Sequence, residues 1–450
     1  MGEVTVQTDA QAVGSGTHSS EDVAPRQWFG TDGVRGIVGE TLTAELVEAI
    51  GRAATLWSGR GRVLVGRDTR GSGPALEAAV TRGIVDGGGT AVLGGILPTP
   101  AVALLSQDLG LVVSASHNPP EYNGVKVFDR EGHKLTDADE LEIEALVGAP
   151  GPGGGSVEHA EDVVESYVDH VVEQFGSDLG GLRIAVDCAN GAFSAIAPGV
   201  FERLGAEVTA LAATPNGSNI NDGCGATDLT MLQAAVRAGG HDLGIAFDGD
   251  GDRMLAVDGN GHMVDGDQIV AICALALGVD LVAVTVMTNL GFHRLMEERG
   301  IRVLTTDVGD RYVLDALRRE GGMLGGEQSG HLIVLDGHVS GDGIAAALTL
   351  CRSLAGRPLA EAAAVMPRFP QAKENVVVPS LEIGPAVADE VERLNAELSG
   401  RGRVLVRPSG TEPVVRVLAE AESAEEAEGL CGSIADLVRR EAGAVKALQR

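Results

Sequence analysis

Three aspartates at alternating positions, Asp248, Asp250 and Asp252, stand in the run DGDGDR. Carboxylates at this spacing can converge on one hard cation, and the glycines between them let the backbone fold around it. A calcium EF-hand is the competing interpretation. Its sixth and twelfth positions need glycine and glutamate, where this chain has Arg253 and Gly259. Three protein carboxylates leave coordination positions open, so the run predicts a magnesium site that can accept a phosphate oxygen.

Ser116 stands in the run SASHNP, directly after the apolar segment Leu109–Val113. Serine is a poor nucleophile without activation. As a phosphate carrier it needs a metal and cations to neutralise the transferring group, and a partner that moves the hydroxyl proton. Taken alone, the run favours an ordinary turn, because serine, asparagine and proline are common turn residues.

The run GGEQSGH, residues 325–331, places a carboxylate, a hydroxyl and an imidazole on a glycine-rich backbone. Glu327 and Ser329 can hydrogen-bond sugar hydroxyls or an amino group. His331 can donate a proton or bind phosphate. Taken alone, this run is also typical of a solvated turn.

The run RPSGTEP, residues 407–413, is the fourth polar loop. An arginine, two hydroxyls and free backbone N–H groups around a glycine form an anion nest. The alternative is a loop with scattered arginines, which fits Arg416 better than it fits the whole set. The residues predicted to bind the anion are Arg407, Ser409, Gly410, Thr411 and Arg416.

The overall charge of the chain narrows the class of ligand. Its 450 residues carry a formal net charge of −30, which repels nucleic acid and anionic membranes because both are polyanions. A phosphorylated substrate therefore needs a local cationic pocket. Five cysteines without a CxxC pair argue against a disulfide framework or a zinc site and fit a reducing cytoplasm. Residues 1–24 contain no apolar run, and we expect a disordered extension rather than a signal peptide there.

The elements that must position these loops alternate along the chain. Short β-branched runs such as Arg62–Val65, Leu182–Val186 and Val282–Met287 precede polar turns and helical stretches. This alternation predicts βαβ units and largely parallel sheets, in which ligands bind at the carboxyl ends of strands. A Gly/Pro linker at Gly148–Ser156 marks one boundary. The pattern changes again at Pro367–Glu374, after which we expect strand, helix, strand and a long acidic helix.

The four loops, in this order, resemble the α-D-phosphohexomutase superfamily over nearly the whole chain after residue 24. Gln328 is a marker of the phosphoglucosamine mutase branch, since phosphomannomutase/phosphoglucomutase relatives more often carry methionine there. Pro408 departs from relatives that have a basic residue at this place. The other runs similar to this branch are FGTDGVRG (29–36), GRDTR (66–70), PNGSNIN (215–221), GDRY (309–312) and GEQSGH (326–331).

The resemblance implies an α/β fold of four domains around a central active-site cleft. Three domains would have mixed, mostly parallel sheets, and a smaller C-terminal domain would be α+β. After the extension at residues 1–24, the expected domains span 25–155 with the phosphoserine loop, 156–254 with the metal loop, 255–367 with the sugar loop and 368–450 with the phosphate loop.

The resemblance also implies a role for each candidate residue. Ser116 would be the phosphoserine and would hold one Mg²⁺ together with Asp248, Asp250 and Asp252. Glu327 and Ser329 would hold the sugar, and the residues of the anion nest would hold the phosphate that is not reacting. The implied catalytic residues beside Ser116 are Lys126, a proton-transfer candidate, with Arg35, Arg253 and His331.

The implied reaction interconverts glucosamine 6-phosphate and glucosamine 1-phosphate in the cytoplasm. It would pass through a hexosamine 1,6-bisphosphate that also activates the enzyme, and the product would feed UDP-N-acetylglucosamine and cell-wall synthesis. The implied partner is a small phosphosugar, not nucleic acid or membrane, and a homodimer is the family-level expectation. The alternatives are the same reaction on glucose or mannose phosphates, a serine-based sugar phosphatase, and a non-catalytic metal-binding protein.

Overall fold

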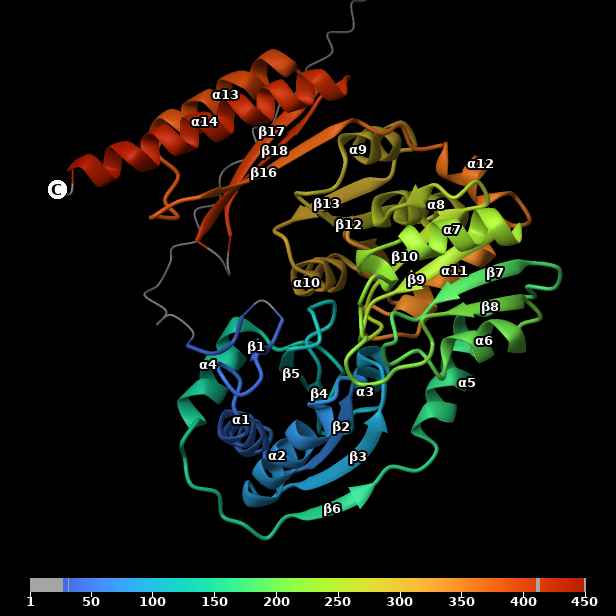
Figure 1. Ribbon diagram of the computed structural model, residues 1–450, viewed down its shortest axis with the longest axis vertical. Coiled ribbons are helices and arrows are strands. Elements are labelled where there is room, and N and C mark those ends of the chain that lie inside the picture. The colour runs from blue at the N-terminus through green and yellow to red at the C-terminus, as the bar shows by residue number, and fades with distance from the viewer. Residues whose placement is uncertain (1–26, 31, 410–412, 449–450) are drawn as a thin grey trace, which may run out of the picture.

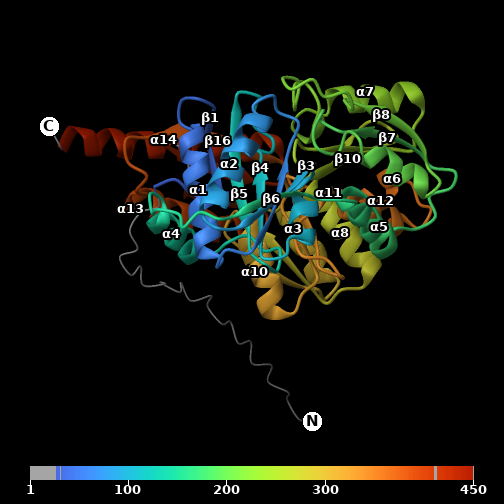
Figure 2. The same ribbon diagram turned by 90° about the horizontal axis from the view of Figure 1, so that it is seen from below.

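The computed structural model describes residues 27–30, 32–409 and 413–448, so the extension expected over residues 1–24 lies outside the described residues. Four β-sheets, each with its own helices, follow one another around an arc from the blue first unit to the red fourth unit (Figure 1). Seen from below, the last helix extends away to one side of the molecule (Figure 2). This arrangement confirms the predicted fold class.

The first unit has a six-stranded sheet in the order β1-β5-β4-β2-β3-β6. β4, β2, β3 and β6 run parallel, whereas β5 is antiparallel to both β4 and β1. The strands are β1 (Val34–Ile37), β2 (Arg62–Arg67), β3 (Thr90–Ile96), β4 (Leu109–Val113), β5 (Tyr122–Phe128) and β6 (Ser156–His159). The helices are α1 (Ala44–Trp57), α2 (Gly73–Asp86), α3 (Thr99–Leu105) and α4 (Asp137–Leu146).

The second unit has a five-stranded sheet in the order β11-β10-β9-β7-β8, with two parallel and two antiparallel pairs. Its strands are β7 (Arg183–Asp187), β8 (Glu207–Leu211), β9 (Leu243–Phe247), β10 (Met254–Asp258) and β11 (Met263–Val264). Its helices are α5 (Val163–Phe175), α6 (Ala197–Arg203), the 3₁₀ turn η1 (Gly225–Thr227) and α7 (Thr230–Gly239). β6 extends the first sheet and β10 with β11 extend the second, so each sheet continues past the boundary expected at residue 155 or 254.

The third unit has the sheet β13-β12-β14-β15, in which only the β14–β15 pair is antiparallel among the described strands. Its strands are β12 (Leu281–Thr285), β13 (Arg302–Thr306), β14 (Leu324–Gly326) and β15 (Leu332–Val334). Its helices are α8 (Gly266–Leu277), α9 (Leu290–Glu298), α10 (Asp310–Glu320), α11 (Gly343–Leu354) and α12 (Leu359–Ala363).

The fourth unit is an antiparallel sheet, β16-β18-β17, packed against two helices. The expected order of strand, helix, strand and helix is wrong by one strand, because residues 403–420 form two strands joined at the RPSGTEP run. Both arms of that hairpin are rich in valine and leucine, so each can pair as a strand. The elements are β16 (Gln371–Val377), α13 (Pro385–Leu398), β17 (Arg403–Pro408), β18 (Val414–Glu420) and α14 (Ala424–Leu448).

The fourth unit is packed separately from the rest, whereas the first three units share one hydrophobic cluster in addition to smaller clusters of their own. One cluster of buried side chains runs through the first three units, from Leu64 in β2 through Phe247 in β9 to Ile344 in α11. The fourth unit has its own cluster, from Val376 to Val438. Among the described residues, no helix is long and apolar enough to cross a membrane.

Candidate active site

Ser116 lies in the turn between β4 and β5 and is fully buried. β4 is a run of five buried apolar residues, so the polar residues that follow begin where the strand leaves the core. Ser116 Oγ donates a hydrogen bond of 2.5 Å to Oδ2 of Asp248, which opens the turn between β9 and β10 in the second unit. The fold therefore joins two predicted loops that lie 132 residues apart.

The three aspartates of the DGDGDR turn are buried and converge. One carboxylate oxygen from each of Asp248, Asp250 and Asp252 lies within 4.8 Å of the other two. Oδ1 of Asp250 and Oδ1 of Asp252 are buried and have no hydrogen-bond partner within the described part of the chain. Unpaired buried carboxylate oxygens are costly, and a hard cation satisfies them. The oxygen donors present thus fit a divalent metal.

The charges around the turn shift the pKa values of Asp248 and Asp252 in opposite directions. Burial, followed by the negative charges of Asp252 and Asp250, raises the pKa of Asp248 well above its ordinary value. Burial acts in the same direction on Asp252, but the ammonium group of Lys126, together with His331 and Lys134, outweighs it, so the pKa of Asp252 lies well below its ordinary value. A bound cation would relieve the repulsion felt by Asp248.

Lys126 reaches the acidic turn from β5. β5 pairs with β4 so that Lys126 lies opposite Val112, four residues before Ser116. Its Nζ lies 2.7 Å from Oδ2 of Asp250 and 2.8 Å from Oδ2 of Asp252. Burial alone lowers the pKa of Lys126, but the surrounding carboxylates raise it well above its ordinary value. The amine is therefore held as a cation beside the aspartates.

Arg35 lies on β1, which pairs with the other edge of β5. Its Nη1 donates to Oδ1 of Asn118 at 2.9 Å, and its Nη2 is paired with Asp32. Arg35 is thus attached to the loop that carries Ser116. Its side chain is partly exposed.

His331 lies at the end of an arc of alternating charges. Lys134 lies 2.6 Å from a carboxylate oxygen of Asp32 and 2.6 Å from one of Asp310. Asp310 lies 3.2 Å from Nε2 of His331, whose Nδ1 lies 3.7 Å from Asp252. Burial lowers the pKa of His331, but the charge of Asp310 and the contact with Asp252 outweigh it and raise that pKa. The imidazole is therefore favoured as a cation next to the acidic turn.

Glu327 brings the sugar-loop candidate to the same place. It lies in the turn between β14 and β15, and its Oε1 accepts a hydrogen bond of 3.1 Å from the backbone N–H of Gly309. Burial raises the pKa of Glu327 and the nearby charge of Arg253 opposes this rise. Arg253 in turn donates its backbone N–H to Asp248 at 3.1 Å. Ser329, two residues on, is exposed.

The phosphate-loop candidate lies at the tip of the β17–β18 hairpin. Arg407 and Arg416 are cross-strand partners, and Nη2 of Arg416 donates to Oγ of Ser409 at 3.2 Å. Burial and the like charge of Arg416 lower the pKa of Arg407, and the charges of Asp307 and Glu327 oppose this. Arg407 thus lies near enough to Asp307 and Glu327 for their charges to act on it. Gly410 and Thr411 lie outside the described residues.

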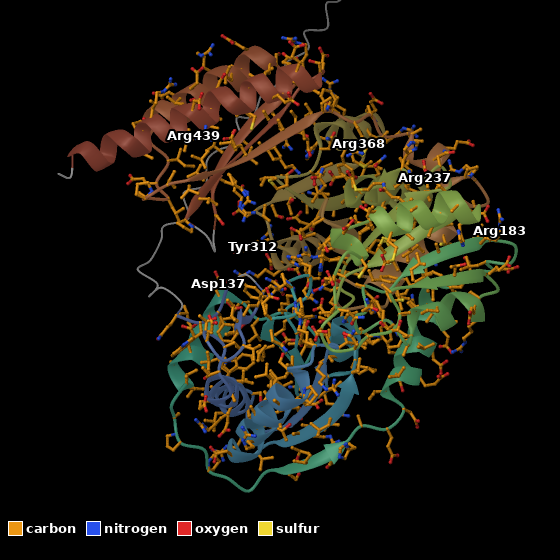
Figure 3. The ribbon with its side chains drawn as sticks, in the orientation of Figure 1. Asp137, Arg183, Arg237, Tyr312, Arg368 and Arg439 are labelled. Carbon is orange, nitrogen blue, oxygen red and sulfur yellow. The ribbon has the colours of Figure 1, made fainter. Side chains whose placement is uncertain are left out.

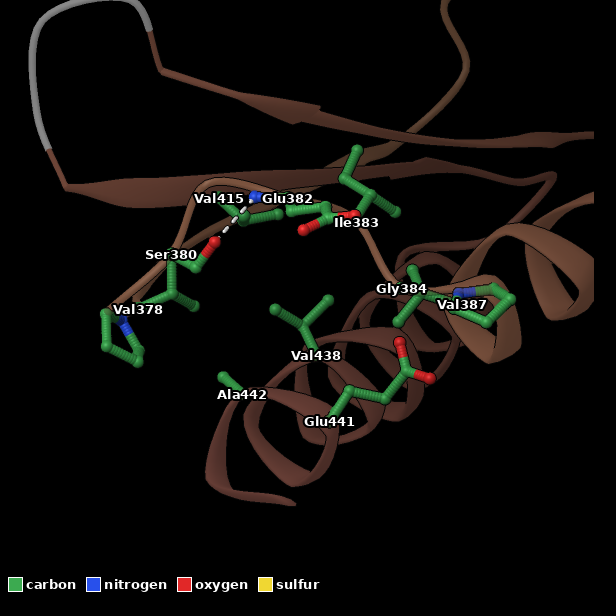
Figure 4. Close-up of a pocket in the computed structure, with 12 residues that line it drawn as sticks. Val378, Ser380, Glu382, Ile383, Gly384, Val387, Val415, Val438, Glu441 and Ala442 are labelled. Carbon is green, nitrogen blue, oxygen red and sulfur yellow. Dashed lines mark hydrogen bonds between the residues drawn. The ribbon is translucent and has the colours of Figure 1, made fainter. Parts of the chain in front are cut away.

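The chain also has contacts and a cavity away from these loops. Asp137 and Tyr312, labelled in Figure 3, mark where α4 of the first unit meets α10 of the third, and Arg311 lies 2.6 Å from Asp137 there. An apolar pocket in the fourth unit lies between the start of α13 and the side chains of Val438 and Glu441 on α14 (Figure 4). None of its lining residues belongs to the four polar loops.

Family models match most of the chain. The phosphoglucomutase/phosphomannomutase alpha/beta/alpha domains I, II and III match residues 26–150, 165–261 and 265–369, and the C-terminal domain of the same family matches residues 363–437. The chain belongs to the phosphoglucomutase/phosphomannomutase family.

Individual members of this family match along nearly their whole length. A phosphoglucosamine mutase of Pelotomaculum thermopropionicum is 47% identical over 91% of this chain and 98% of its own. A phosphoglucosamine mutase of Saccharopolyspora erythraea is 49% identical over 91% and 98%. The crystal structure of a phosphoglucomutase/phosphomannomutase family protein from Burkholderia thailandensis is 28% identical, with a TM-score of 0.79 over 93% of this chain and 97% of that one.

Several residues of the site carried no role in the sequence analysis. His117 follows Ser116, and its Nδ1 lies 3.4 Å from the serine Oγ. Burial, with the charges of Arg253 and Arg35, lowers the pKa of His117 to about 4, so the ring is neutral at neutral pH. Asp32 and Asp310 lie within runs that are similar to the family, FGTDGVRG and GDRY, and these runs could have pointed to both residues as parts of the site. Lys134 had no such signal, because its two partners are distant in sequence.

Proposed function

We propose that this member of the family interconverts glucosamine 6-phosphate and glucosamine 1-phosphate. The hydrogen bond from buried Ser116 to Asp248 of the acidic turn carries the proposal, because it places a hydroxyl at a site that fits a divalent metal. The phosphoglucosamine mutases that are 47% and 49% identical over nearly full length support the choice of substrate.

In the proposed cycle, Ser116 begins phosphorylated. The free hydroxyl of the sugar gives up its proton and attacks that phosphorus, the bond to Ser116 Oγ breaks, this oxygen takes up a proton, and a hexosamine 1,6-bisphosphate forms. The bisphosphate turns over, and the Ser116 hydroxyl loses its proton and attacks the other phosphorus. The bond from that phosphorus to the sugar oxygen breaks, this oxygen takes up a proton, and the isomeric monophosphate leaves. Bisphosphate lost between the two steps must be replaced from solution, which makes it an activator as well as an intermediate.

Asp248, Asp250, Asp252 and the oxygen on Ser116 would hold one Mg²⁺, which neutralises charge on the transferring phosphoryl group. Lys126, Arg35 and Arg253 add positive charge at the same place, and cations there stabilise the transition state more than the ground state. Lys126 and His331 are the proposed proton carriers. Both favour the protonated form, so each is suited to donate a proton to the oxygen that leaves.

The substrate would be held at both of its ends. Glu327 and Ser329 are the proposed ligands of the sugar, and the carboxylate suits the amino group of glucosamine. The distal phosphate would be bound by Arg407, Ser409, Gly410, Thr411 and Arg416. We propose four domains over residues 25–155, 156–254, 255–367 and 368–450, with β6 completing the sheet of the first domain and β10 and β11 completing that of the second. We also propose that the enzyme works in the cytoplasm as a homodimer and supplies UDP-N-acetylglucosamine synthesis.

Intact-mass analysis tests the phosphoserine. We expect one added phosphate that maps to Ser116 and is lost on incubation with glucosamine 6-phosphate. Kinetics on three substrates tests which sugar phosphate the enzyme prefers. We expect kcat/KM to be much higher with glucosamine 6-phosphate than with glucose or mannose phosphates. Comparable values on all three would overturn the substrate assignment, and stoichiometric release of free phosphate would indicate a phosphatase.

A further inference from the structure

The loop that carries Ser116 is held by two backbone carbonyl groups. These are the carbonyl oxygens of Ser116 and Asn118, on either side of His117. Arg70, which is buried after β2, donates from Nη2 to the first at 2.9 Å and to the second at 2.7 Å. Its Nε is bound to the buried carboxylate of Asp68 at 2.9 Å. Arg70 thus fixes the loop from within the first unit.

Asn221 binds the same two carbonyl oxygens from the second unit. Its Nδ2 donates to Ser116 O at 2.9 Å and to Asn118 O at 3.2 Å. Its own backbone is anchored by a 2.9 Å hydrogen bond from its N–H to the carbonyl of Ala189, in the turn after β7. Asn221 therefore ties the serine loop to the body of the second unit, which also carries the acidic turn.

The surroundings of this junction leave it little freedom. Ser116 has a left-handed backbone with φ of 51°, which is unfavourable for a residue with a Cβ and persists only where the surroundings impose it. At Gly249, beside Asp248, an added Cβ would lie 2.6 Å from Ser116 O and 2.9 Å from Asn221 Nδ2. The acidic turn and the Asn221 amide thus approach the same carbonyl.

We propose that Asn221 is a positioning residue for phosphoryl transfer: it locks the Ser116 loop of the first unit to the metal-binding turn of the second. The phosphoserine must meet the same metal and cations in both half-reactions, so the Ser116 Oγ must return to one place. A misplacement of about 1 Å in such a site can lower the rate about 100-fold. The kinetic part of this inference rests on the proposed function.

The test compares Asn221→Ala with Asn216→Ala. Asn216 stands in the same loop. Its Oδ1 accepts hydrogen bonds from Ser218, at 2.9 Å from the backbone N–H and at 3.0 Å from Oγ, and these contacts stay within the loop. We expect Asn221→Ala to lower kcat about 10- to 100-fold in both directions with little change in KM. Asn216→Ala should leave kcat unchanged. Asn221→Asp, which replaces the donor amide by an acceptor, should be at least as damaging as Asn221→Ala.

Hydrogen exchange without substrate supplies a second readout that does not depend on the sugar. The amides of Asn118 and Tyr122 are bonded within the loop, to the carbonyls of Ala115 and Pro119. Asn221→Ala should speed exchange in the peptide that covers residues 114–122, and Asn216→Ala should not.

The outcomes separate the two proposals. Faster loop exchange in a protein whose wild type is inactive on glucosamine phosphates would sink the proposed function and keep the role of Asn221. Unchanged exchange in Asn221→Ala would overturn that role, whether or not kcat falls, because Asn221 would then not act through the loop.

Discussion

The junction that holds Ser116 and the hairpin that carries Arg407 are built in different ways. Ser116 is fully buried, belongs to a unit that shares a hydrophobic cluster with the next two units, and is fixed by side chains from two units. Arg407 is only half-buried and belongs to a unit with a core of its own. The proposed chemistry thus stands on a fixed frame, and the proposed phosphate ligand stands on a separately packed body.

The joint between these bodies is polar. Asn289 Nδ2 donates to the carbonyl of Phe369 at 2.9 Å, and Lys373 Nζ donates to Gln328 Oε1 at 2.6 Å. Gln328 Nε2 also donates to Gln371 Oε1 at 3.0 Å. Gln328 therefore links the sugar loop to β16. A joint made of hydrogen bonds can be remade at small cost, which suits a substrate that must present both ends to one serine.

Removing the fixed nucleophile should have the largest effect. We expect Ser116→Ala to lower kcat on the order of 10⁴-fold or more, because the phosphate carrier itself is lost. The variant should also lack the added phosphate in intact-mass analysis. Ser433→Ala, which removes a hydroxyl from the surface of α14, is the matched control and should behave as wild type. Substantial turnover in Ser116→Ala would exclude Ser116 as the carrier.

Removing the metal tests whether the acidic turn beside Ser116 binds a cation that the reaction needs. Dialysis against EDTA should lower kcat by about 100- to 1000-fold, since a metal contributes several kcal/mol to charge stabilisation. Added Mg²⁺ should restore the rate. Asp250→Asn should raise the Mg²⁺ concentration needed for half-maximal activity, because Oδ1 of Asp250 is one of the unpaired oxygens. Full activity after metal removal would show that the acidic turn serves another purpose.

The separately packed unit should show its contribution in KM. Arg407→Ala removes a charged hydrogen-bond donor worth about 1.5–3 kcal/mol, which is about 10- to 150-fold. We expect most of that loss in KM and less in kcat, since the phosphate it binds is not the one in transfer. Arg401→Ala, an exposed arginine of the same unit, is the control. A loss confined to kcat would place Arg407 at the reacting phosphate instead.

The smallest expected effect concerns the contacts between the third and fourth units, where one buried aspartate should make the free energy of unfolding depend on pH. Burial and the neighbouring charge of Asp265 raise the pKa of Asp267 to about 7, and Asp267 Oδ2 accepts from Gln328 Nε2 at 3.2 Å. The folded state keeps this proton up to about pH 7 while the unfolded chain releases it near pH 4, so the free energy of unfolding falls as pH rises between these values.

Asp267→Asn removes that titration. Thermal unfolding should show the variant gaining stability relative to wild type between about pH 4 and about pH 7. Asp258→Asn, at another buried aspartate, controls for the general effect of losing a carboxylate. A constant difference in Tm across this range would mean that Asp267 is ionised throughout.

Much of the site was readable from local chemistry. The strands Leu109–Val113 and Leu243–Phe247 were visible as apolar runs, and the polar turns after them were visible by composition. The contribution of Lys134 was not visible, because it depends on Asp32 and Asp310, which lie on other segments. The extra strand of the fourth unit was also missed, since a strand pair around a glycine turn reads like one interrupted segment.

The sequence by itself determined which residue types could bind a metal, carry a phosphate and hold an anion, because these capacities belong to side chains and their local spacing. Only the tertiary structure decided that Ser116 Oγ meets Asp248, that Lys126 lies among the aspartates, and that Arg70 and Asn221 bind the same two carbonyl oxygens. Those contacts depend on strand order and on how two different sheets pack against each other. They join residues that no short stretch of sequence contains together.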